Sequence, residues 1–187
     1  MLGEPGLEGS ISAYYYTGMR DVFVGSLWAV GVFMILYRND TVDDSVTSAG
    51  GVCAVLVAIF PTAPAGELAS HGWVPYVHLA AATALFVLLA VLAAVRFPVS
   101  DPGVAADNAK HVRVAVYRAC GAAIALSVVA ALVDGVLAKI GVVGPGHLFW
   151  FESVALVAFG VSWLVKSRAL PVRRMREEVG RPSAFSV

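Results

Sequence analysis

Four ionisable side chains fall within long apolar stretches of the sequence, where charge is costly and therefore often functional. They are Asp21, His78, Asp134 and Glu152, and Arg20 lies beside the first of them. Carboxylates near an imidazole in a low-dielectric place can alter one another's protonation, relay a proton, act as acid and base, or bind a metal ion. Oxygen and imidazole ligands together would suit zinc, manganese or iron.

The spacing of these residues completes no metal or catalytic motif. His147 and Glu152 are five residues apart, which on a helix places them roughly 140° from each other. Cys53 and Cys120 lack the short paired spacing of metal or redox motifs. A hydrogen-bonded network that only holds helices together is an equally ordinary explanation of the polar residues, and Asp21 can simply cap the helix that it opens.

The composition indicates the medium in which these groups sit. Of the 187 residues, 59% are apolar and only 14% are charged, and the mean hydropathy is +0.79. Soluble domains carry about 25% charged residues. The 13 basic and 13 acidic side chains cancel, so no overall field favours nucleic acid as a partner. The sequence therefore predicts an integral membrane protein, whose first partner is the lipid bilayer.

Five apolar runs are long enough to cross a bilayer core, which takes about 20 helical residues. The predicted fold class is therefore all-α, a transmembrane helix bundle of five spans. Small residues at turn spacing, such as Gly25 with Ala29 and Gly50 with Ala54 and Ala58, predict close helix contacts. The predicted spans are 21–37, 42–60, 76–95, 113–138 and 147–165.

Lysine and arginine are distributed unevenly about these spans. All 13 except Arg20 and Lys139 fall on one side of the predicted membrane, and basic loops stay in the cytoplasm. We therefore expect a multi-pass plasma-membrane protein with its N-terminus outside and its C-terminus in the cytoplasm. Residues 1–20 are predicted to form an extracytoplasmic interfacial segment, rich in tyrosine. Residues 166–187 are predicted to form a basic cytoplasmic tail.

This topology brings the singled-out residues to one depth, toward the outer leaflet. It predicts that they gather in a shared polar cluster of side chains from four different helices. The cytoplasmic halves of the spans are, by contrast, expected to be almost free of internal charge. The members of the predicted cluster are Arg20, Asp21, His78, Asp134 and Glu152.

Two segments resemble those of a group of small bacterial six-helix membrane proteins of unknown function, which is similar to the Frag/DRAM/Sfk-type families. The segments are SISAYYYTGMRDVFVG at 10–25 and FWFESVALVAFGVSWLVK at 149–166, and Phe60-Pro61-Thr62 and His78 also fall where the group has them. The resemblance covers most of the chain from 10 to 166 and implies a membrane fold rather than an activity. Members of the group have a helix before the first of these segments, so the question of a sixth span upstream stays open.

The sequence favours a non-catalytic accessory or binding subunit, without a cofactor, whose outer polar cluster holds helices, a ligand or other membrane-protein subunits. The alternative is a metal-dependent hydrolase of a lipid or other amphiphile. In that case the zinc ligands or acid–base groups would be Asp21, His78, Asp134 and Glu152. This set is more distantly similar to that of the alkaline-ceramidase and progestin-receptor-like hydrolases, whose histidine pair is missing here.

Overall fold

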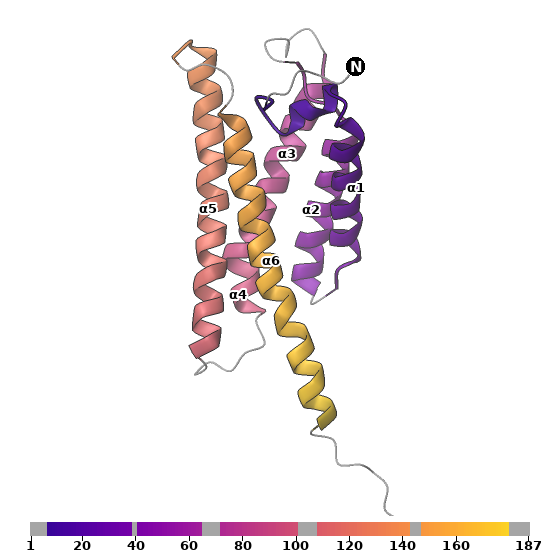
Figure 1. The fold of residues 1–187 in the computed structure, drawn as a ribbon, viewed down its shortest axis with the longest axis vertical. Coiled ribbons are helices and arrows are strands. Elements are labelled where there is room, and N and C mark those ends of the chain that lie inside the picture. The colour runs from indigo at the N-terminus through magenta and orange to yellow at the C-terminus, as the bar shows by residue number, and fades with distance from the viewer. Residues whose placement is uncertain (1–6, 39–40, 65–71, 101–107, 143–146, 180–187) are drawn as a thin grey trace, which may run out of the picture.

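The computed structural model describes residues 7–38, 41–64, 72–100, 108–142 and 147–179, which form helices and turns with no strand among them. Figure 1 shows the long helices side by side in an elongated bundle. A short 3₁₀ helix, η1 (Ser12–Tyr16), precedes them. The long helices are α1 (Arg20–Leu36), α2 (Thr41–Ile59), α3 (Val74–Val91), α5 (Asn108–Lys139) and α6 (Leu148–Val179).

Each of the five apolar runs forms a helix, so the predicted all-α architecture is confirmed. Four helical stretches are long and apolar enough to cross a membrane, by length and composition. α1 has 17 residues and is shorter than these four, so the structure does not confirm the count of five spans. The four stretches are Val42–Ile59, Val74–Val99, Lys110–Lys139 and Leu148–Ser167.

α3 continues through a widened turn near its end. A π-helical segment, η3 (Leu92–Arg96), joins it to the short α4 (Phe97–Val99). Pro98 has no amide hydrogen, and its ring crowds the carbonyl four residues earlier, which lies within η3. A wider turn relieves that crowding without ending the helix, and single π turns of this kind occur often at functional positions.

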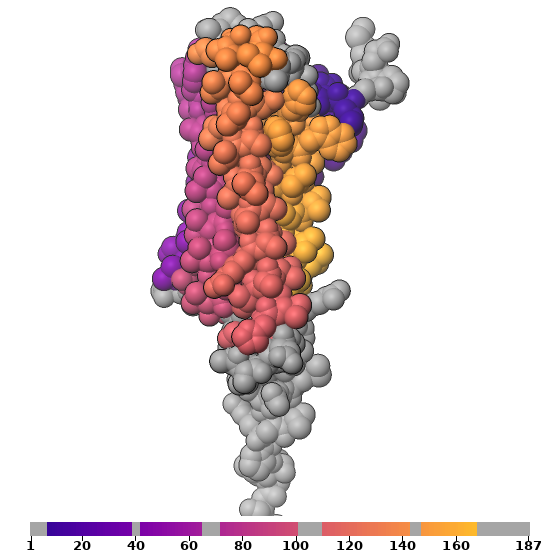
Figure 2. All heavy atoms as spheres, turned by 90° about the vertical axis from the view of Figure 1, so that its left-hand side faces the viewer, coloured from indigo at the N-terminus to yellow at the C-terminus, as the bar shows by residue number. Residues whose placement is uncertain are grey.

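The core lies where α3 and η3 pack between α2 and α5. α1 covers α2, and α6 covers α5. In Figure 2, α5 occupies the middle of one face, flanked by α3 and α6. The outer side of α5 is apolar and exposed at Leu126, Val129 and Val133, as expected of a surface that faces lipid. The buried core comprises Met34, Ala54, Leu85, Leu89, Leu92, Ala93, Phe97, Tyr117, Ile124 and Ala155.

Small residues mark two close helix contacts. A Cβ atom on Gly51 of α2 would lie 2.5 Å from the carbonyl oxygen of Gly31 in α1. The predicted small face of α2 is buried at Gly50, Ala54 and Ala58. The same prediction is wrong for Gly25, whose Cβ would meet nothing within 4 Å.

α6 is longer than the predicted span. The predicted span ends at residue 165, whereas the helix continues to Val179, and Figure 1 shows its last turns extending past the bundle. The described part of the predicted tail is therefore helical, a continuation of α6.

Candidate functional site

Glu152 anchors the N-terminal segment to α6. Its Oε2 accepts a hydrogen bond from the backbone N–H of Ile11, 2.6 Å away, and Ile11 caps η1. A carboxylate at a helix N-terminus binds N–H groups that have no partner within the helix. The N–H of Phe149, one turn before Glu152, donates to the Gly9 carbonyl at 3.0 Å. Residues 9–16 therefore form a strap fixed to the start of α6.

The other end of the strap reaches the segment that follows α2. The hydroxyl of Tyr16 donates to the carbonyl of Thr62. Arg20 donates to the hydroxyl of Tyr15 at 2.9 Å, and its guanidinium lies 4.5 Å from the centre of that ring. In Figure 1 the strap crosses the end of the bundle at which α1, α3 and α6 begin.

His78 fixes the end of α2. Its Nδ1 lies 2.7 Å from the carbonyl oxygen of Phe60, which precedes Pro61 and so lies where the helix ladder stops. A carbonyl oxygen can only accept a hydrogen bond, so Nδ1 is the donor and carries a proton. The Nε2 atom is buried, without a hydrogen-bond partner among the described residues.

Asp134 and Asp21 lie in different surroundings. Asp134 Oδ1 is 3.2 Å from Nδ1 of His147, which joins the end of α5 to the start of α6. Asp21 is exposed in the first turn of α1, where a carboxylate favours the positive end of the helix dipole.

The five residues predicted to share one cluster thus have separate environments. The helix ends that carry them lie at one end of the bundle (Figure 1), but within the described residues no hydrogen bond or ion pair joins two of the five. Nor do any three histidine, cysteine, aspartate or glutamate side chains of the described ranges lie where they could hold a metal. The zinc-ligand set considered from the sequence is therefore not assembled here.

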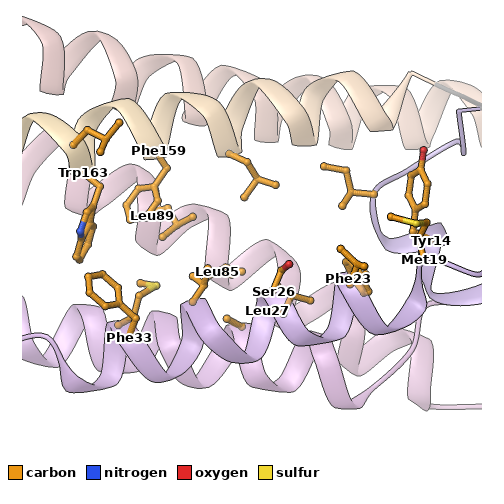
Figure 3. A pocket seen from close by; sticks show the side chains of 18 residues that line it. Tyr14, Met19, Phe23, Ser26, Leu27, Phe33, Leu85, Leu89, Phe159 and Trp163 are labelled. Carbon is orange, nitrogen blue, oxygen red and sulfur yellow. The ribbon is translucent and has the colours of Figure 1, made fainter.

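An apolar groove of about 650 Å³ runs along the bundle between α1 and α6. Figure 3 shows the two helices as its walls, with Leu85 and Leu89 of α3 between them. Tyr14 of the strap and Met19 stand at one end, and Phe33 and Trp163 at the other. The lining residues are Ile11, Tyr14, Met19, Val22, Phe23, Ser26, Leu27, Val30, Phe33, Met34, Ala54, Leu85, Leu89, Leu156, Phe159, Gly160, Trp163 and Leu164.

A cluster of aromatic rings lies at the end of the groove opposite the strap. The ring centre of Trp163 lies 5.4 Å from that of Phe33 and 4.9 Å from that of Tyr37, both near the end of α1. It also lies 5.5 Å from Phe97 of α4 and 5.4 Å from Phe159 of its own helix. These five residues, which we name the plug, join α1, α4 and α6 through edge and tilted ring contacts that stabilise beyond simple burial.

No protein-family model, no curated protein and no solved structure matches this chain. The interpretation of the site therefore depends on the geometry of the chain itself.

The expectation that the halves of the spans opposite the strap are almost free of charge is wrong. Asp43, 1% exposed, pairs with Nε of Arg96 at 2.5 Å between α2 and η3. Lys166, 3% exposed, donates to the hydroxyl and carbonyl of Ser100. The sequence carries a signal for this ion pair. Asp43 opens the second predicted span and Arg96 follows the third, so the two residues lie at adjacent ends of antiparallel helices.

We expect replacement of Glu152 by leucine to release the strap. The Ile11 N–H would lose its hydrogen-bond partner in a site that excludes much of the solvent, at about 1–3 kcal/mol. Amide hydrogen exchange of residues 9–16, followed by mass spectrometry, should therefore speed up about ten- to hundredfold.

Ser153→Ala is the matched control, because that hydroxyl bonds only the Phe149 carbonyl of its own helix. Equal exchange rates in the Glu152→Leu variant and the parent protein would show that the contact does not hold the strap.

Proposed function

We propose that this chain is a non-catalytic, multi-pass membrane protein that binds the hydrocarbon chain of an amphiphile in the groove between α1 and α6. The groove itself is the observation that supports this proposal. Its lining offers mostly hydrocarbon surface (Figure 3), and its walls belong to a bundle with four helices suited to a membrane. Its volume is within the range of about 300–1,000 Å³ that ligand sites occupy.

The length of the groove suits an extended hydrocarbon chain. Met19 and Phe33 both line the groove, and a helix rises about 21 Å between them. The groove is thus long enough to hold one chain of an amphiphile in an extended form.

The topology belongs to the same proposal. α1 runs beside α2 at the same level of the bundle (Figure 1), and its 17 residues rise about 26 Å, near the lower limit for a span. We therefore include α1 as a fifth span. We place the protein in the plasma membrane, with the strap outside the cell and the C-terminus in the cytoplasm. The uneven distribution of lysine and arginine supports this orientation.

Two earlier expectations remain predictions. Nothing in the structure bears on the resemblance to the six-helix bacterial group, or on other membrane-protein subunits as partners. The described residues supply a binding groove, and this favours the binding function over the hydrolase.

Filling the middle of the groove tests the proposed function. Ser26 is exposed and lines the groove halfway along α1, so Ser26→Trp should occupy it without disturbing the core. With the protein in phosphatidylcholine nanodiscs, a palmitoyl lysophosphatidylcholine with a photoreactive diazirine on its chain should label α1 and α6. Labelling of the Ser26→Trp variant should fall about tenfold, because the chain would have to displace the indole.

Ala29→Trp is the matched control. Ala29 is also exposed on α1 but does not line the groove. Labelling that is equal in the two variants, or spread over the outer side of α5, would refute the proposed function.

A further inference from the structure

Resting on the proposed function, we propose that the groove measures chain length. One extended chain lies along it with its polar end beside the strap and its terminal methyl group against the plug. The ligand class is therefore a single-chain amphiphile with a defined maximum length.

The polar end of the ligand belongs beside the strap because a cation lies there. Met19 lines the groove, and the exposed guanidinium of Arg20, which follows it directly, can pair with an anionic headgroup. At the other end, the lining rings of Phe33, Phe159 and Trp163 offer a headgroup no charged partner.

Trp163 stands across the tail end of the groove (Figure 3). It is held between rings of α1 and α4, so it cannot turn aside without breaking contacts with two other helices. These ring contacts stabilise its position beyond simple burial. A chain that reaches the plug must therefore stop there.

The length of the groove sets the expected chain. An all-trans hydrocarbon advances about 1.25 Å per carbon, so about 21 Å of groove holds about 17 carbons. A chain in one leaflet of a fluid bilayer occupies only about 15 Å of depth. The groove thus selects a chain that is straighter than its neighbours in the membrane.

A length series tests this inference. Lysophosphatidylcholines of roughly 12 to 22 carbons, each with a diazirine on the last carbon, would compete in nanodiscs with the palmitoyl probe. Occupancy should peak near 16 to 18 carbons and fall about tenfold for chains roughly four carbons longer, because the excess cannot be accommodated. The terminal diazirine should label residues near Gly160 and Trp163, whereas a headgroup diazirine should label Tyr14 and Met19.

Two variants should move the length limit in opposite directions. A side chain at Gly160 meets open space in the groove, one turn before Trp163, so Gly160→Leu should shorten the preferred chain by about three to four carbons. Trp163→Ala should lengthen it. Gly135→Leu on α5, where a Cβ also meets nothing within 4 Å, should change neither the preferred length nor the labelled residues.

The outcomes separate this inference from the proposed function. Suppose that Ser26→Trp abolishes labelling of the groove, but that labelling does not depend on chain length, or that the terminal and headgroup probes label the opposite ends. Either result overturns only the inference about chain length. Labelling that Ser26→Trp leaves unchanged overturns both. If no probe labels the groove, and two copies of the chain cross-link at α1 and α6, a second copy occupies the groove. That result would also overturn both the proposed function and the length inference.

Discussion

Replacing Asp43 by asparagine is expected to destabilise the protein by about 3 kcal/mol, because it removes one partner of a largely buried ion pair. The Asp43 side chain is 1% exposed and that of Arg96 18%, and their closest atoms are 2.5 Å apart. The slight exposure of Arg96 lets its guanidinium recover some hydration, which places the cost at the lower end of the range for buried pairs. Denaturant unfolding in detergent micelles, followed by tryptophan fluorescence, would measure the loss.

Two further variants separate the ion pair from its surroundings. Asp21→Asn removes a carboxylate from an exposed position on α1 and should change stability by less than about 0.5 kcal/mol. The double replacement of Asp43 and Arg96 by leucine should recover much of the loss, because neither charge then remains. A loss below about 1 kcal/mol for Asp43→Asn would show that the pair does not stabilise the contact between α2 and η3.

The helices could be predicted from the sequence because each depends on a local pattern. A run of apolar residues must form a helix in lipid to satisfy its own backbone, and prolines limit where it can continue. The predicted run 42–60 differs from α2 by one residue at each end. The continuation of α6 beyond residue 165 was missed because hydropathy reports where lipid ends, not where helical hydrogen bonding ends.

Polar partners were harder to predict because they depend on packing between distant segments. Glu152 binds an N–H that lies 141 residues away, and nothing in either local sequence specifies that contact. The predicted topology puts Glu152 and His78 at one end of the bundle. It does not specify in which direction each side chain points from its helix. The groove was missed for the same reason, since it is a space between α1 and α6 rather than a property of either helix.

Gly121→Ala is expected to destabilise the protein by about 2–3 kcal/mol. A Cβ atom at this position of α5 would lie 2.5 Å from Cβ and 2.6 Å from the backbone nitrogen of Ala94 in η3. Both atoms are tied to the backbone, so a helix must shift, and overpacking of this kind costs about 1–3 kcal/mol. The same unfolding experiment would measure the change.

Gly135→Ala provides the comparison that isolates the clash. It lies on the same helix with nothing within 4 Å of its new Cβ, and alanine favours a helix over glycine by about 1 kcal/mol. This variant should therefore be as stable as the parent protein or more so. Because both variants gain the same helix propensity, the difference between them measures the close approach of α5 to η3. Equal stabilities would mean that the two helices are farther apart in the membrane, and that the π-helical turn beside Pro98 is not held by this contact.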